Sequence, residues 1–339
     1  MPPATAAPRP RERHGWRGRS RIRFNARTMT TGEIPEAITI VSGSTTAGFV
    51  PAANMVCASL QVGDDELLHQ THGLQAYAEQ GKTMCIPLLH PWANRLHRRG
   101  YEAAGRAVEL PAPEGRYPVD PNGLPIHGAL PGDLVWDASR AAADRVRAWL
   151  HWNRPALLEL FPFEHELELE ATVSDGALSI ATTIVATGSD RVPVSFGFHP
   201  YLTLPVGHRD DWRVRLGAAD RLVLDEQMIP TGERTPLESR KVRLCGSSWD
   251  DGLAGLDEPP AFAVSAHGRR LTVTFDEGFG WAQVYAPPGQ DFICFEPMTA
   301  PTDALNSGEG LIVLAPGERH RTRFTVALGE IDDEEDQWT

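Results

Sequence analysis

Two titratable side chains interrupt apolar stretches of this chain and could together perform acid–base chemistry. Glu296 lies within the hydrophobic segment 291–299, and His199 directly follows the apolar run 194–198. A carboxylate is seldom buried without a partner or a function, and loss of solvent raises its pKa and makes it a stronger base. Histidine titrates near neutral pH and can donate or accept a proton there. Both are candidate catalytic residues, although His199 alone is equally compatible with a core histidine bonded to the backbone.

Two further segments carry side chains suited to holding a polar ligand. Arg95 follows Trp92 and Asn94 in an otherwise apolar stretch, and its guanidinium offers a rigid set of donors for hydroxyl or carboxylate oxygens. His127 lies in the glycine-flanked segment 123–128, where glycine would let the backbone approach a ligand closely. Taken singly, Arg95 is also compatible with a structural ion pair and His127 with a structural role.

Other signals are weaker or missing. Asp250 and Asp251 precede Gly252, a composition that favours a turn. There is no phosphate-binding loop, no HExxH metal motif and no GxSxG nucleophile elbow. The cysteines are far apart and form no CxxC pair, which predicts free thiols in a reducing, cytoplasmic setting and no metal or other cofactor: they are Cys57, Cys85, Cys245 and Cys294.

The elements that must position these residues are strands. Apolar and polar residues alternate over 166–173, the turn 174–176 follows, and the alternation resumes over 178–184, which predicts a β-hairpin. Only 138–150 has a helical pattern. Further strands are predicted at 191–198, 212–216, 241–245, 261–266, 270–275, 281–286, 291–296, 310–315 and 320–328. Short strands joined by turns at this spacing predict an all-β antiparallel sandwich or barrel.

The charge is divided unevenly along the 339 residues, and the division predicts the domain organisation. The net charge is −13, but residues 1–28 carry eight arginines and one acid, so this segment has a charge of +7 and the remainder −20. We expect a disordered arginine-rich extension over 1–35, one β-domain over 36–329 and an acidic tail over 330–339. A strongly acidic domain repels nucleic acid and anionic membranes, so we expect neither as a partner.

Four short motifs, in order, resemble those of the aldose 1-epimerase (mutarotase) family over about residues 40–328. They are Asn94-Arg95, His127-Gly128, His199-Pro200-Tyr201 and Glu296-Pro297-Met298. The resemblance implies a large antiparallel β-supersandwich of the galactose mutarotase type, with a sugar site in an open cleft. It also implies a monomer or homodimer that acts on a small-molecule sugar without a cofactor.

The resemblance implies an acid–base reaction at the anomeric carbon. Glu296 would be the general base that removes the proton from the anomeric hydroxyl. His199, when protonated, would be the general acid that protonates the ring oxygen. The ring would then open, rotate about the C1–C2 bond and close again as the other anomer.

The remaining site residues would bind the sugar. By the same resemblance, His127, Arg95 and Asp250 hold its hydroxyl groups and ring oxygen. Asn94, beside Arg95, is also expected to bind the sugar. From its place next to Arg95, the Trp92 indole is a candidate platform for the sugar ring.

Three other functions stay open at this point. A hexose-6-phosphate 1-epimerase would share the acid–base pair but needs extra cations for the phosphate, and Arg98 and Arg99 are the nearest ones in sequence. A non-catalytic carbohydrate-binding protein of the same fold would not need both Glu296 and His199. A metal site built from histidines is disfavoured because no ligand pair has tight spacing.

Overall fold

The computed structural model describes residues 36–238 and 240–331, and the expectations for 1–35 and for most of the acidic tail lie outside this range. Antiparallel strands dominate the described residues, as the sequence predicts. The helices are short: α1 (Leu74–Gln80), α2 (Pro155–Leu158), α3 (Ala304–Ser307) and the 3-10 turns Pro131–Asp133 and Arg209–Asp211. None of the helices in the described part of the chain has the length and apolar character needed to cross a bilayer.

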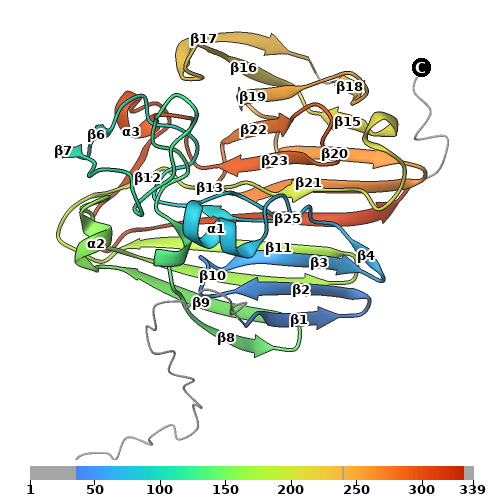
Figure 1. Cartoon of the computed structure of the whole chain (residues 1–339), viewed down its shortest axis with the longest axis horizontal. Coiled ribbons are helices and arrows are strands. Elements are labelled where there is room, and N and C mark those ends of the chain that lie inside the picture. The colour runs from blue at the N-terminus through green and yellow to red at the C-terminus, as the bar shows by residue number, and fades with distance from the viewer. Residues whose placement is uncertain (1–35, 239, 332–339) are drawn as a thin grey trace, which may run out of the picture. The chain divides into compact units, whose positions relative to one another are not determined.

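Two large sheets form most of the fold (Figure 1). The nine-stranded sheet has the order β18 (Arg240–Arg243), β15 (Arg213–Leu216), β20 (Ala261–Ala266), β21 (Arg269–Glu277), β25 (Arg319–Glu330), β11 (Ala177–Ala186), β10 (His165–Ser174), β9 (Arg145–Trp152) and β8 (Asp137–Ala142). The second has the order β17 (Pro230–Leu237), β16 (Ala219–Leu224), β19 (Trp249–Ala254), β22 (Trp281–Ala286), β23 (Ile293–Met298), β13 (Gly197–Phe198) and β5 (Leu88–Leu89), with β14 (Tyr201–Leu202) also paired to β23.

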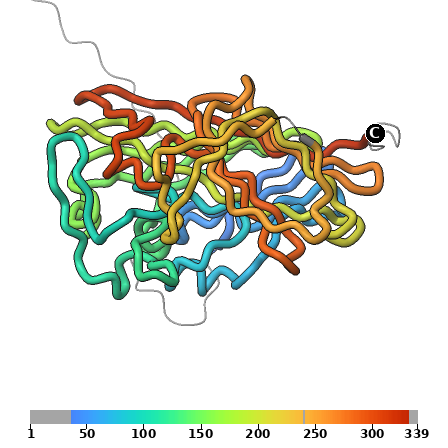
Figure 2. The backbone as a smooth tube through the Cα atoms, turned by 90° about the horizontal axis from the view of Figure 1, so that it is seen from above, coloured from blue at the N-terminus to red at the C-terminus, as the bar shows by residue number. Residues whose placement is uncertain are grey.

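Smaller sheets complete the described part of the chain. One has four strands, β1 (Ile38–Ser42), β2 (Thr45–Val50), β3 (Val56–Val62) and β4 (Asp65–Glu66). The others pair β12 (Val192–Val194) with β24 (Ile312–Leu314), and β6 (Gly100–Ala103) with β7 (Arg106–Glu109). The last strand, β25, runs beside β11 in the middle of the nine-stranded sheet (Figure 2). This sheet therefore depends on pairing between segments that are far apart in the sequence.

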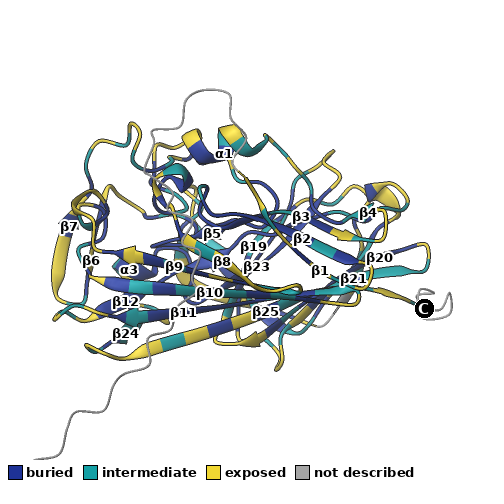
Figure 3. Cartoon of the chain, turned by 90° about the horizontal axis from the view of Figure 1, so that it is seen from below, coloured by how far each residue is buried: buried dark blue, intermediate teal, exposed yellow. Residues whose placement is uncertain are grey.

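The predicted hairpin is confirmed as β10 and β11. Its register runs from His165 opposite Ala186 to Ser174 opposite Ala177. Buried and partly exposed residues alternate along β10, as expected when one face of a strand covers the core, and bands of the two kinds are visible along these strands in Figure 3. The other predicted strands also overlap observed ones, although 191–198 is divided between β12 and β13.

Two local predictions are wrong. Residues 138–150 form most of the antiparallel pair β8 and β9 instead of a helix, because every second residue of β9, from Val146 to Trp152, is buried; tertiary burial overrides the helix propensity of the alanines. Asp250 and Asp251 lie within strand β19 and not in a turn, and Asp250 pairs with Tyr285 of β22.

The main apolar core of the described residues lies between the two large sheets. Phe262 of β20 stacks on Phe295 of β23 with ring centroids 5.6 Å apart, and Phe198 of β13 lies 4.9 Å from Phe324 of β25. Each of these aromatic pairs connects the nine-stranded sheet to the second sheet. As predicted, Cys57, Cys85, Cys245 and Cys294 are free thiols; the first two and Cys294 are buried, and Cys245 is exposed.

Segment 90–96, which carries Arg95, is fixed by backbone contacts with distant residues. His90 forms a parallel bridge to Gly128, and Arg95 an antiparallel bridge to Ile126. A Cβ atom on Gly128 would lie 2.1 Å from the carbonyl oxygen of His90, and Gly128 has a φ of +78°. The glycine beside His127 is therefore required by this backbone contact, and not by the approach of a ligand as the sequence suggested.

Substitution of Gly128 by alanine tests this close contact. The overlap with His90 and the left-handed backbone should together lower the free energy of unfolding by about 3 kcal/mol or more. Gly123→Ala is the matched control, because Gly123 also has a φ of +78° but nothing lies within 4 Å of its added Cβ; it should cost about 1 kcal/mol. Urea unfolding of both variants measures the difference, and equal losses would contradict the assigned contact.

Candidate active site

The structure brings Glu296 and His199 together. Glu296 lies on β23, and His199 directly follows β13, which pairs with β23 through Gly197 and Met298. His199 Nε2 is 3.3 Å from Glu296 Oε1, and the two residues are only 6% and 1% exposed. His199 Nδ1 and Glu296 Oε2 are buried and have no hydrogen-bond partner among the described residues. Buried polar atoms are normally satisfied, so this pair is suited to receiving a polar ligand.

Burial makes the pair hold a single proton. It raises the pKa of Glu296 well above the usual range of a glutamate; the charge of Asp250 raises it further, and Arg95 opposes both. Burial also lowers the pKa of His199 to about 3. Burial therefore favours the uncharged pair, in which Glu296 is protonated and His199 is neutral. Transfer of that proton to His199 gives the carboxylate–imidazolium form without any exchange with solvent, because the two forms bind the same number of protons.

Aromatic rings fix the position of His199. The phenol of Tyr201 stacks on its imidazole, with centroids 4.5 Å apart and planes inclined by 4°. The Tyr201 hydroxyl is 2.6 Å from the Thr83 hydroxyl. The His127 ring meets the His199 ring edge-on at 5.5 Å, and Tyr285 does so at 5.9 Å. The imidazole therefore has little freedom to turn away from Glu296.

His127 itself is held by its backbone. Its φ is +63°, and its backbone N–H donates to the carbonyl of Asn94 at 2.9 Å. Burial lowers the pKa of His127 well below its usual value, with smaller contributions from His199 and Arg95. Its imidazole is therefore neutral and can offer a ligand one donor and one acceptor.

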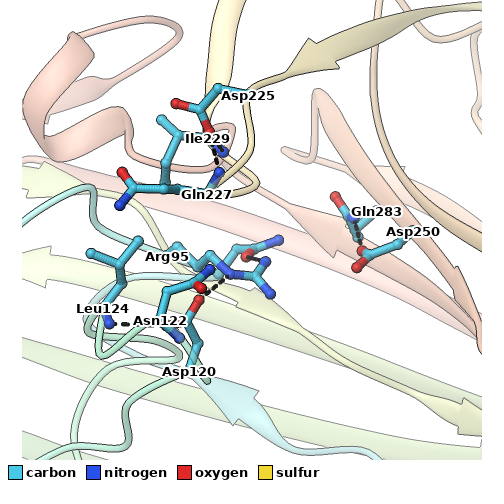
Figure 4. Close-up of polar contacts among 10 residues, drawn as sticks. Arg95, Asp120, Asn122, Leu124, Asp225, Gln227, Ile229, Asp250 and Gln283 are labelled. Atoms are coloured by element: carbon cyan, nitrogen blue, oxygen red, sulfur yellow. Dashed lines mark hydrogen bonds and ion pairs between the residues drawn. The ribbon is translucent and has the colours of Figure 1, made fainter.

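Arg95 is held by an aspartate that the sequence analysis did not single out. Arg95 Nε donates to Asp120 Oδ2 at 2.9 Å, and Nη1 donates to Asn94 Oδ1 at 3.0 Å. Asp120 Oδ1 in turn accepts the backbone N–H groups of Asn122 and Leu124, each at 2.9 Å. Figure 4 shows the guanidinium pointing away from Asp120 toward the side on which Asp250 and Gln283 lie. Arg95 thus forms a structural ion pair, which was one of the two interpretations of this residue. The ion pair with Asp120 also orients the remaining N–H donors of the guanidinium.

Asp250 lies on the adjacent part of the second sheet. Its Oδ1 accepts a hydrogen bond of 2.6 Å from Gln283 Nε2, and Gln283 lies opposite Glu296 in the register of β22 and β23. Burial raises the pKa of Asp250, and the Gln283 bond opposes this. Neighbouring residues on a strand point to opposite faces, and the Asp251 carboxylate pairs instead with Arg221 at 3.3 Å. Asp250 is therefore the aspartate on the side of Glu296.

A buried arginine joins the strand ends that present these groups. Arg209 Nη1 donates to the Leu244 carbonyl at 2.9 Å, and Nη2 donates to the carbonyls of Ser247 at 2.7 Å and Ala286 at 3.3 Å. Ala286 is paired with Trp249, one position beyond the Asp250–Tyr285 pair. The guanidinium thereby fixes the edge of the site without contacting its interior.

Two residues predicted at the site have other surroundings. Trp92 is fully buried and packs against Tyr101 and Tyr117, with centroids 6.4 and 6.3 Å away. Its indole has no face open to a sugar, so the expectation of a platform at Trp92 is wrong. Asn94 is 5% exposed, and its side-chain oxygen accepts a hydrogen bond from Arg95. Asn94 therefore helps to hold the guanidinium in place.

A cleft of about 920 Å³ opens beside this group of residues. Arg95, Asp120, Tyr201 and Tyr285 line it.

The sequence pattern does not indicate Tyr285 and Gln283 as site residues. They lie on a strand whose alternation of apolar and polar residues is typical of any half-buried strand. Asp120 was missed because Asp-Pro-Asn-Gly reads as a turn, which it also forms. Among the residues that the structure describes, no group of three or more His, Cys, Asp or Glu side chains is arranged to hold a metal ion.

Comparison with known proteins identifies the family. The aldose 1-epimerase family model matches residues 57–327, and the chain belongs to this family. It is 25% identical over 254 residues to the uncharacterized protein YihR of Escherichia coli K12, and that match covers 71% of this chain and 80% of YihR.

Solved structures share the fold. The Slr1438 protein from Synechocystis sp. PCC 6803 superposes with a TM-score of 0.73 and 22% identity, over 91% of this chain and all of that one. Galactose 1-epimerase from Lactobacillus acidophilus NCFM superposes with a TM-score of 0.70 and 16% identity, over 87% and 95%. The expected galactose mutarotase-like β-fold is thus confirmed.

Proposed function

We propose that this protein is an aldose 1-epimerase that interconverts the α and β anomers of a free aldose. The observation that carries the proposal is the buried Glu296–His199 pair, 3.3 Å apart, in a member of the aldose 1-epimerase family. Two groups with opposed pKa shifts on one site are what concerted acid–base catalysis needs.

Ring opening uses both members of the pair. The Glu296 carboxylate removes the proton from the C1 hydroxyl, and protonated His199 gives its proton to the ring oxygen. The C1–O5 bond breaks with its electron pair on O5, and the C1 carbonyl forms. After rotation about C1–C2, the same two transfers run in reverse and close the ring on the other face. Each proton transfer contributes roughly 10²–10⁴-fold to the rate.

Burial of the pair favours the open-chain stage. When the ring has opened, Glu296 is protonated and His199 is neutral. This is the protonation state that desolvation favours at both residues. The site therefore stabilises the pair at the stage of the reaction in which the sugar is least stable.

The charges around the cleft support an uncharged aldose as substrate. Its charged lining residues are Arg95, Lys82, Asp120 and Glu114, so their formal charges cancel. The arginines that the phosphate alternative would use lie elsewhere: Arg98 is exposed and 3.9 Å from Glu109, and neither Arg98 nor Arg99 lines the cleft. A purely binding protein would not need Glu296 and His199 in contact.

Replacement of the pair tests the proposal. Glu296→Gln keeps the shape but cannot accept the C1 proton, so the polarimetric rate of α-glucose or α-galactose mutarotation should fall to the spontaneous rate. His199→Asn should lower kcat far more than it changes KM. Circular dichroism and thermal unfolding check that both variants are folded. A near-native rate in folded Glu296→Gln would refute the assignment of the base.

The pH profile tests the interaction between Asp250 and Glu296. Activity requires the pair to hold its one proton, and loss of that proton at high pH follows the pKa of Glu296, which is raised first by burial and then by the negative charge of Asp250. Asp250→Asn removes that charge, so the basic limb of kcat/KM should move to lower pH, alongside any loss of affinity. Asp251→Asn is the matched control, because Asp251 pairs with Arg221, and it should leave the basic limb in place. A basic limb that moves upward or stays fixed in Asp250→Asn contradicts the coupling.

A further inference from the structure

A buried aspartate outside the acid–base pair connects the strand of Glu296 to the segment of Arg95. Asp303 lies beyond the end of β23, directly before α3, and is buried. Its backbone N–H donates to the carbonyl of Arg95 at 3.0 Å, and its Oδ1 accepts the backbone N–H of His97 at 3.0 Å. Asp303 therefore holds the peptide groups on both sides of Leu96.

The carboxylate of Asp303 is fixed by its own partners. Besides the His97 N–H, Oδ1 accepts from Asn306 Nδ2 at 2.8 Å, and Oδ2 is 2.8 Å from His97 Nδ1. A carboxylate is costly to bury unless such donors surround it. The φ of Asp303 is +65°, a conformation that aspartate and asparagine adopt more readily than most residues. The side chain and its backbone are thus suited to hold a neighbouring segment in one place.

The segment that carries Asp303 is also bonded close to His199. Thr299 follows β23, and both its backbone N–H and its hydroxyl donate to the carbonyl of Phe196, at 3.0 and 2.9 Å. Phe196 directly precedes β13, which leads to His199. Residues 299–303 therefore bond at one end to the chain beside the acid–base pair and at the other end to the backbone of Arg95.

We propose that Asp303 is a positioning residue that sets the place of Arg95 relative to Glu296 and His199. This inference rests on the proposed function, because Arg95 is there expected to hold the oxygen atoms of the sugar beside the pair. Asp303 does not line the cleft, so it acts through the backbone of Arg95 and not by contact with the sugar. Asp120 and Asn94 orient the guanidinium, and Asp303 fixes the backbone from which it extends.

Removal of the carboxylate tests this role. Asp303→Gly loses the side-chain bonds but adopts a positive φ without strain. With Arg95 less well placed, KM for α-glucose should rise about tenfold, an effect of the size expected from one hydrogen bond to a charged group. The change in kcat should be smaller, because a contact made equally to substrate and transition state affects KM. Polarimetric rates at several glucose concentrations give both values.

The pH profile separates positioning from general support of the fold. Arg95 lowers the pKa of Glu296, so its displacement should leave this pKa higher and move the basic limb of kcat/KM to higher pH. The direction is opposite to that expected for Asp250→Asn. The other ionisable groups that interact with Glu296 are retained in Asp303→Gly: they are His199, Asp250, Cys294, Tyr201 and Tyr285.

Two further variants are the controls. Asp303→Asn keeps an oxygen for the His97 N–H and an N–H group for a neutral His97 ring, so it should have the native KM and the native basic limb. Asn306→Ala removes a different bond of the same carboxylate, together with the bond of Asn306 to the Gly100 carbonyl at 3.3 Å. It should lower Tm but leave KM and the basic limb unchanged. Circular dichroism and thermal unfolding show which variants are folded.

The outcomes separate this inference from the proposed function. A native KM and basic limb in folded Asp303→Gly overturn the role of Asp303, and so do equal changes in Asp303→Gly and Asn306→Ala. If Asp303→Gly does not fold, Asp303→Ser replaces it; its shorter side chain cannot reach both His97 nitrogen atoms, so smaller changes in the same directions are expected and native values overturn the role. If the unmodified protein does not exceed the spontaneous rate, the proposed function fails, and the inference fails with it.

Discussion

Burial of a carboxylate against an imidazole is the constraint on which the rest of this site depends. Glu296 and His199 lie 3.3 Å apart at a junction where β23 pairs with β13, and neither has appreciable contact with solvent. Desolvation penalises charge on both, so the pair shares one proton and can move it with little rearrangement. A solvated pair would be ionised at neutral pH and would lack this balance.

The charged side chains near Glu296 and His199 are held in place by hydrogen bonds to other residues. Asp120 holds Arg95 and is itself held by two backbone N–H groups of its turn. Gln283 lies opposite Glu296 and bonds Asp250. Burial is the largest cause of the raised pKa of Glu296, and Asp250 and Arg95 then shift it in opposite directions from fixed positions. Preorganised charges of this kind need no rearrangement during the reaction.

The sequence predicts the strands and the chemical residues better than the contacts between them. Alternation identifies the β10–β11 hairpin because one face of each strand is buried, and Glu296 stands out because a carboxylate in an apolar strand is unusual. The wrong predictions concern residues whose surroundings are formed by segments distant in the sequence. Trp92 is covered by Tyr101 and Tyr117, and Gly128 is required by the backbone of His90. Neither neighbour can be recognised from local composition.

Proton NMR of glucose in D₂O tests the central claim most directly. Acid–base opening of the hemiacetal moves protons only between oxygen atoms and the protein, so the hydrogens on C1 and C2 stay in place. We expect protein-dependent saturation transfer between the α and β anomeric protons, with the H1 and H2 signals at full intensity. Loss of the H2 signal to deuterium would show chemistry at C2 instead, and no transfer above the spontaneous rate would show that Glu296 and His199 do not open the ring. Either result would contradict this account.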